Sequence, residues 1–151
     1  MPLRRTADNV LLLAGKAGHD GPVAALVISE DGKWVATGSD DTTVILWDAH
    51  GACISQEWFA HDGIVRDLAF SPDNRSLATA GDDRKVKVWD ITRDACTIAV
   101  LEGSLSPGHG CTWSRDGATI AALYEDGLIQ LWDACTYQQT RILDEDRKSV
   151  V

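Results

Sequence analysis

The segment from His61 to Asp90 recurs twice more in this chain at a nearly constant interval. The first two copies open with His-Asp-Gly, and all three close with Trp-Asp. The closing tryptophans are 42 and 43 residues apart. A period of this length indicates one small structural unit stacked three times, because such a unit cannot bury its apolar surface alone. The three copies are His19–Asp48, His61–Asp90 and Ser104–Asp133.

Each copy has the pattern of three short β-strands separated by two turns. In the second copy, Val65–Phe70, Ser76–Ala80 and Val86–Trp89 contain the aliphatic, β-branched and aromatic residues that favour strands. Pro, Asn, Asp and Gly punctuate them as turns. Four further apolar segments flank the copies, and we expect each of them to be the outermost strand of a unit. Three units need only three such strands, so one is surplus. The four segments are Val10–Ala14, Ile54–Phe59, Cys96–Leu101 and Arg141–Leu143.

The period, the His near the start and the closing Trp-Asp resemble the WD40 repeat family, whose repeats form the four-stranded blades of a β-propeller. The resemblance implies an all-β fold in which three WD40-like blades form a partial propeller. It predicts a single domain over residues 1–151, with an outer strand at 8–15 and blade repeats at 19–60, 61–102 and 103–144. We expect the short charged tail, residues 145–151, to be frayed.

A His, a strand hydroxyl, a turn Asp and a strand Trp recur together in the first two copies. His, Asp and a hydroxyl are also the components of a hydrolytic triad. Their repetition favours architecture over catalysis, and WD40 blades use these four positions as a buried hydrogen-bond network. The network residues implied by the resemblance are His19, Thr37, Asp41 and Trp47, then His61, Thr79, Asp83 and Trp89, and finally Asp126 and Trp132.

The third copy departs from this pattern. Ala122 stands where the second copy has Thr79, Ser104 takes the His position, and His109 falls five residues too late. We therefore expect the third blade to lack the network and to be the least regular of the three.

The resemblance also implies a partner-binding face. In WD40 proteins, the residue before the network Asp and the start of the innermost strand line one face around the central channel. A ring of acidic residues there suits a peptide that carries Lys or Arg. Acidic residues also favour turns for conformational reasons, and that alternative stays open. The positions carried over are Asp40, Asp82 and Glu125, then Ala24, Arg66 and His109, and two residues earlier Pro22, Ile64 and Pro107.

Three blades are too few for a closed propeller, which needs about four to eight. Left open, they would expose two apolar blade faces, a kind of surface that marks association. Three alternatives follow: head-to-tail self-assembly as a homodimer or homotrimer, a fragment of a larger WD40 signalling protein, or docking on another protein's incomplete ring. The chain begins at Met1 and ends without an interrupted repeat, so self-assembly is the favoured expectation.

Composition narrows the classes of partner. The net charge of −9 argues against a general nucleic-acid binder, because such proteins concentrate Lys and Arg. No apolar run approaches the length of a membrane span, so no membrane partner is expected. None of the four cysteines forms a Cys-x-x-Cys pair or has a His at zinc-ligand spacing, which predicts buried or half-buried structural thiols, no metal and a cytoplasmic location.

These observations predict a non-catalytic scaffold or recognition module that binds a protein or peptide and needs no cofactor. The competing prediction is an oligomeric propeller that binds a carbohydrate or small ligand on Trp34, Trp58 or Trp113, because exposed indole rings are stacking platforms. An enzyme is the weakest alternative, since no polar cluster occurs outside the repeats.

Overall fold

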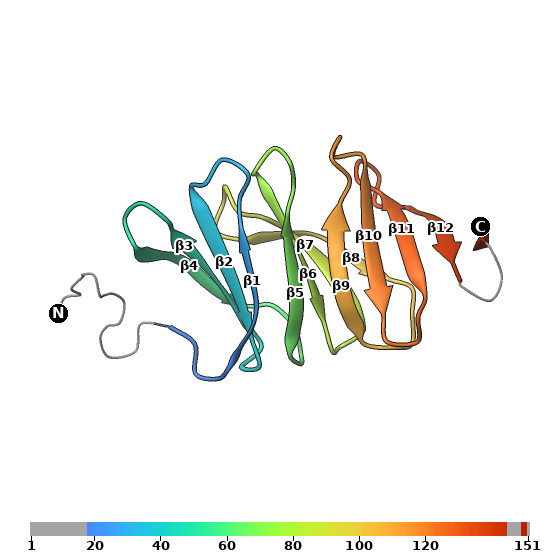
Figure 1. Cartoon of the computed structure of the whole chain (residues 1–151), viewed down its shortest axis with the longest axis horizontal. Helices are drawn as coiled ribbons and strands as arrows, with labels where there is room; N and C mark the ends of the chain where they lie inside the picture. Colours follow the sequence, from blue (N-terminus) through green and yellow to red (C-terminus); the bar gives the residue numbers. More distant parts are fainter. Residues whose placement is uncertain (1–17, 145–148, 151) are drawn as a thin grey trace.

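The computed structural model describes residues 18–144 and 149–150. In that part of the chain, three antiparallel sheets stand side by side without a helix (Figure 1). This confirms the all-β fold of three four-stranded blades that do not by themselves close a ring. The strands are β1 (Val23–Ile28), β2 (Trp34–Ser39), β3 (Thr43–Asp48), β4 (Cys53–Phe59), β5 (Val65–Phe70), β6 (Ser76–Gly81), β7 (Lys85–Asp90), β8 (Cys96–Glu102), β9 (Gly108–Trp113), β10 (Thr119–Tyr124), β11 (Ile129–Asp133), β12 (Gln139–Leu143) and β13 (Ser149–Val150).

The sheets follow the chain in order, as β1-β2-β3-β4, β5-β6-β7-β8 and β9-β10-β11-β12 with β13 added beyond β12. The prediction of a frayed tail is wrong at β13, because Ser149 and Val150 pair with Leu143 and Ile142 as a fifth strand. The first four strands of the third sheet follow the same order as those of the second, and the fifth strand distinguishes it from the two four-stranded sheets. The proposed outer strand at 8–15, like residues 145–148 and 151 of the tail, lies outside the described residues.

A repeated serine explains why the first hairpin of every sheet has the same shape. The Ser71 hydroxyl donates to Asp73 Oδ1 at 2.6 Å and accepts the Ser76 amide at 3.0 Å. These bonds pin both sides of the turn between β5 and β6, as a local side-chain cap does. The same two bonds occur in the other sheets from Ser29, to Asp31 and Trp34, and from Ser114, to Asp116 and Thr119.

The core lies between the sheets rather than within one of them. Leu68, Leu77 and Trp89 of the second sheet pack with Ala36, Val44 and Leu46 of the first. Cys111, Ile120, Ala122, Tyr124 and Trp132 of the third sheet pack with Ala78, Ala80, Val86 and Val88 of the second. The second blade therefore packs one face against the first blade and the other face against the third, as stacked repeats require.

The two outermost sheet faces have no neighbour in the described residues. Leu26 and Ile28 stand at the positions of Leu68 and Phe70, on the face of the first sheet that points away from the second; they are 65% and 64% exposed. On the far face of the third sheet, Leu123 is 45% exposed. Aliphatic side chains that are buried in the middle of the stack are thus solvent-facing at its ends.

Candidate functional site

The second blade contains a continuous hydrogen-bond chain that runs through His61. The indole N–H of Trp89 donates to Thr79 Oγ1 at 3.0 Å, and this hydroxyl lies 2.7 Å from His61 Nε2. His61 Nδ1 lies 2.8 Å from Asp83 Oδ1, which also accepts the Lys85 amide at 3.2 Å. The pattern assigns the Nδ1–H donor to Asp83 and the Nε2 lone pair to the Thr79 hydroxyl, so every member has a partner.

The first blade has the same arrangement with one addition. His19 Nε2 lies 2.8 Å from Thr37 Oγ1, which accepts the Trp47 indole N–H at 2.9 Å. His19 Nδ1 lies 3.2 Å from Asp41 Oδ2, and the extra member is Thr43, whose hydroxyl donates to Asp41 Oδ1 at 2.6 Å. Sequence reasoning missed Thr43, because the second blade has Lys85 at that position and the repeat comparison hides it.

These hydrogen bonds hold both aspartates ionised. Burial alone would raise the pKa of the Asp83 carboxyl, but hydrogen bonds from the His61 ring and the Asp62 amide outweigh burial and lower it from 3.8 to about 2. Burial likewise opposes ionisation of Asp41, and the Thr43 hydroxyl and amide lower its pKa to about 2. Each carboxylate holds the loop that precedes its own blade, by accepting the amide of Asp62 or Asp20.

The third blade keeps only a remnant of the network. Ser104 Oγ lies 3.3 Å from Asp126 Oδ2, and among the described residues no hydrogen bond joins Trp132 to a side chain. Tyr124 takes the position of Gly81, where an added Cβ would lie 2.5 Å from the His61 ring. The third blade thus combines a large Tyr124 with a small Ser104, where the second blade combines a small Gly81 with a large His61. Apolar packing has replaced the polar network in this blade.

Sequence reasoning also missed two side chains, one in the second blade and one in the third, that bind the segment preceding their blade. Lys87 Nζ donates to the Ala60 carbonyl at 2.8 Å, and Gln130 Nε2 donates to the Gly103 carbonyl at 2.7 Å. Both residues occupy the same position of the third strand in their blades, and the first blade has Ile45 there. The sequence did contain a signal for this shared role, because Lys87 and Gln130 stand at the same distance before the closing tryptophan of their repeats.

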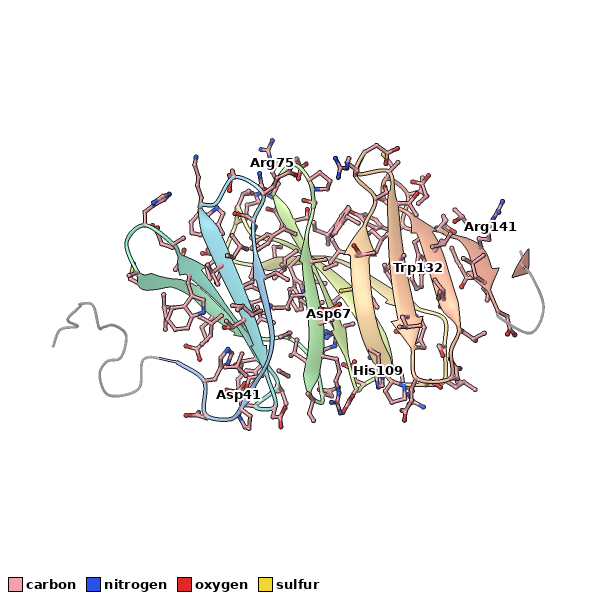
Figure 2. All side chains as sticks on the ribbon, viewed as in Figure 1. Asp41, Asp67, Arg75, His109, Trp132 and Arg141 are labelled. Carbon is pink, nitrogen blue, oxygen red and sulfur yellow. The ribbon has the colours of Figure 1, made fainter. Side chains whose placement is uncertain are left out.

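The predicted partner-binding residues gather at one end of the inner strands. Ala24, Arg66 and His109 are each the extra residue of a β-bulge, at the same point of β1, β5 and β9. A bulge redirects a side chain out of the strand's alternation, and all three side chains are exposed. Figure 2 shows His109 and Asp41 at the same end of the sheets and Arg75 at the opposite end.

The three acidic positions are fixed to the start of each inner strand by one repeated backbone bond. The amides of Asp40, Asp82 and Glu125 donate to the carbonyls of Pro22, Ile64 and Pro107, in each case at 3.0 Å. This places all three repeats in the same register, including the segment 103–110, where the sequences differ most. We call this set the channel rim; it consists of the exposed residues Ala24, Asp40, Arg66, His109 and Glu125 and the half-buried Asp82.

Arg66 is the electrostatic centre of the channel rim. Its guanidinium forms a two-pronged ion pair with Asp82, with Nε–Oδ1 at 2.7 Å and Nη2–Oδ2 at 2.9 Å. This pairing lowers the pKa of the Asp82 carboxyl and raises that of Arg66. The charges of Asp40 and Glu125, from the two flanking blades, also raise the pKa of Arg66. The rim therefore keeps an excess of negative charge.

The tryptophans of the small-ligand alternative are half-buried packing residues. Trp34 and Trp58 pack against the core between the first two sheets, and the Trp58 ring lies 5.6 Å from the Trp89 ring. Trp113 packs against the core between the second and third sheets and donates its indole N–H to the Ala69 carbonyl at 3.1 Å. Trp58 and Trp113 also each line a surface pocket, of about 300 and 290 Å³.

The prediction of buried or half-buried cysteines is confirmed for Cys111 and wrong for the other three. Cys111 is buried, and burial raises the pKa of its thiol well above the usual value. Cys53, Cys96 and Cys135 are exposed, because each opens or precedes an outermost strand whose side chains face solvent. In residues 18–144 and 149–150, no group of His, Cys, Asp and Glu side chains is arranged to hold a metal ion. That part of the chain also contains no apolar helix of membrane-spanning length.

Comparison with known proteins adds independent information on this architecture. The family model described as WD domain, G-beta repeat matches residues 12–48, 51–90 and 98–133. The protein HIR1 of Cryptococcus neoformans var. neoformans serotype D is 25% identical over 137 residues, which cover 91% of this chain and 12% of that protein.

Two relatives match over fewer residues than one repeat contains. The ribosome biogenesis protein BOP1 homolog of Oryza sativa subsp. japonica is 45% identical over 38 residues, or 24% of this chain and 6% of that protein. The ribosome biogenesis protein erb1 of Botryotinia fuckeliana is 55% identical over 31 residues, or 20% of this chain and 4% of that protein. The chain spans about an eighth or less of the length of these relatives.

Proposed function

Because the chain belongs to the WD40 repeat family, we propose that it is a non-catalytic protein-interaction module whose channel rim binds a basic peptide segment. The observation that carries this proposal is that the same backbone bond holds Asp40, Asp82 and Glu125 at equivalent points of three adjacent sheets. Three blades contribute equivalent positions to one surface, so a single peptide crossing it meets all of them. An excess of carboxylates favours Lys and Arg side chains in that peptide.

Non-catalytic function is supported by the roles of the polar residues. His61, Thr79 and Asp83 satisfy one another and Trp89 inside the blade, and His61 is only 4% exposed. A nucleophile has to meet its substrate, and these groups are occupied in holding a loop. The half-buried Trp34, Trp58 and Trp113 speak against the alternative of a carbohydrate-binding propeller.

We further propose that the open sheet faces are covered by self-assembly into a closed propeller. Leu26, Ile28 and Leu123 are exposed at the two ends of the stack, and apolar surface of this kind favours association. Coverage by additional blades of a longer polypeptide is the competing explanation, since the relatives are much longer proteins. The cytoplasmic location stays a prediction.

Peptide binding to the rim tests the proposed function. Fluorescently labelled Lys- and Arg-rich peptides should bind the chain in an anisotropy titration, and sequence-matched acidic peptides should not. Replacing the rim acids together (Asp40→Asn, Asp82→Asn, Glu125→Gln) should weaken binding by about tenfold at low salt, because three attractive charges are removed. The matched control removes three exposed acids elsewhere (Glu30→Gln, Asp94→Asn, Glu102→Gln). An equal loss in the control, or no binding by any basic peptide, would overturn the proposal.

A further inference from the structure

The far face of the third sheet contains an apolar cavity of about 370 Å³. We call it the β9–β11 cavity, because its wall is formed by residues of those three strands, with Asp67, Cys111 and Ala122 behind them. Its wall residues on the open side are Gly110, Thr112, Ala121, Leu123 and Ile129. No part of the described chain fills it.

The same depression exists on the first and second sheets, where it is occupied. On the first sheet it is formed by Ala25, Val27, Ala36, Gly38 and Val44, which pair with one another in the same register. Leu68 of the second sheet packs into it and is 2% exposed; a Cβ at Gly38 would lie 3.5 Å from Leu68 Cδ2. On the second sheet the corresponding residue that fills the depression is Cys111, with its Sγ 3.6 Å from the Ala78 carbonyl.

Strand register identifies the third member of this set. Leu68 pairs with Thr79 and Cys111 with Ala122, and the residue that pairs with Thr37 at the equivalent point of the first sheet is Leu26. Leu26 is 65% exposed. The chain thus carries one unfilled depression at one end of the stack and one unburied filling residue at the other.

We propose that Leu26 of one copy of this chain inserts into the β9–β11 cavity of a second copy, so that the copies join head to tail. The inference rests on the self-assembly proposed above and names the contact that drives it. The new junction repeats the leucine-filled junction between the first and second sheets, since Gly110 and Ala121 leave room for a leucine. The cysteine-filled junction is different, because there Asp67 Oδ2 accepts the Cys111 amide at 3.0 Å and Gly110 offers no such acceptor.

One wall residue distinguishes the new junction from both internal ones. Leu123 stands where the occupied depressions have Gly38 and Ala80, and Val65 packs directly against Gly38. In the assembly, Leu123 meets the partner copy's equivalent of Val65, which is Val23 and is 54% exposed. Leu123 and Val23 are together larger than Gly38 and Val65. At this end of the inner strands they therefore hold the two copies further apart than two neighbouring sheets of one chain.

Two surface variants test the contact, and neither alters the interior of the stack. Leu26→Lys removes the filling side chain and leaves the cavity intact, whereas Ala121→Phe fills the cavity and leaves Leu26 intact. Sedimentation velocity and light scattering over a range of protein concentrations give the mass, and circular dichroism checks that each variant is folded. We expect the unaltered chain to form dimers or trimers, each variant alone to be monomeric, and an equimolar mixture of the two variants to form a one-to-one dimer through its single intact contact.

The outcomes separate this inference from the proposals on which it builds. A monomeric unaltered chain would overturn both self-assembly and the Leu26 contact, while leaving peptide binding at the rim to its own titration. An oligomer that persists in Leu26→Lys or Ala121→Phe would overturn the Leu26 contact alone. Folded, monomeric variants that fail to combine when mixed would show that the junction is not head to tail, and this too would overturn the inference.

Discussion

The hydroxyl of Thr79 accepts the indole N–H of Trp89 at 3.0 Å, and this bond joins β6 to β7 inside the second blade. The two side chains are 0% and 5% exposed, so water does not compete for the bond. Thr79 also bonds His61, which holds the loop before the blade through Asp83. One hydroxyl therefore connects the strand interior to the loop that leads to the channel rim.

Replacing Thr79 by Ala should destabilise the chain by about 1–3 kcal/mol, because two buried polar groups, the Trp89 N–H and His61 Nε2, lose their partner together. Urea unfolding followed by tryptophan fluorescence measures the change as a lower midpoint. The control is Thr97→Ala, on the exposed outer strand β8, which should leave the midpoint unchanged. Equal midpoints for the two variants would mean that the network contributes no stability.

Acid should weaken the fold in part by protonating Asp41 and Asp83. The pKa of each carboxyl is about 2 in the folded chain, below the ordinary value of 3.8. A lowered pKa stabilises the fold above the unfolded value, and this stabilisation is lost as pH falls from about 4 toward about 2. The loss is on the order of 1–2 kcal/mol for each carboxyl. Urea unfolding at steps between pH 7 and pH 2 would measure it.

Asp83→Asn identifies the source of the acid effect. The variant should be less stable than the unaltered chain at pH 7 and should lose less further stability on acidification, because one of the titrating carboxyls is gone. Asp94→Asn, in an exposed turn, is the control and should follow the unaltered chain. If Asp83→Asn and the unaltered chain lost the same stability between pH 4 and pH 2, Asp83 would not be responsible.

The first two blades could be predicted from sequence because their signals are local and repeated. His19 and His61 stand the same number of residues before their tryptophans, so the pairing of His, Thr and Trp was visible as a spacing. The replacement of the histidine by Ser104 was visible, but its compensation by Tyr124 in place of Gly81 was not. It depends on two positions that are distant in sequence and face each other only across the folded blade.

The tail shows a second limit of sequence reasoning. Composition predicted that residues 145–151 would fray, but Ser149 and Val150 find backbone partners on the free edge of β12. Any extended segment can add to an unpaired strand edge through its backbone, so the side chains of the segment do little to predict this pairing. The exposed cysteines were missed for a related reason, because a thiol's burial depends on which strand is outermost and not on the thiol itself.

Tyr124→Phe should leave stability unchanged or raise it by up to about 1 kcal/mol, because the hydroxyl is buried and no hydrogen-bond partner for it occurs among the described residues. Tyr124→Ala should cost about 3–5 kcal/mol, since it removes the ring that fills the position of the missing histidine. Urea unfolding of both variants gives the two values. A loss of more than about 1 kcal/mol in Tyr124→Phe would show that the hydroxyl has a partner in solution.

Arg66→Ala should strengthen the binding of a Lys-rich peptide, by about threefold to tenfold at low salt. The guanidinium neutralises Asp82 through bonds of 2.7 and 2.9 Å, and its removal frees that carboxylate for the peptide. Anisotropy titrations at low and physiological salt would measure the gain, which should shrink as salt screens the charges. Arg75→Ala removes the same charge at the opposite end of the sheets (Figure 2) and should change affinity little. Weaker binding by Arg66→Ala would instead mean that Arg66 itself contacts the peptide, for example through a backbone carbonyl, and that the acidic residues act mainly to position it.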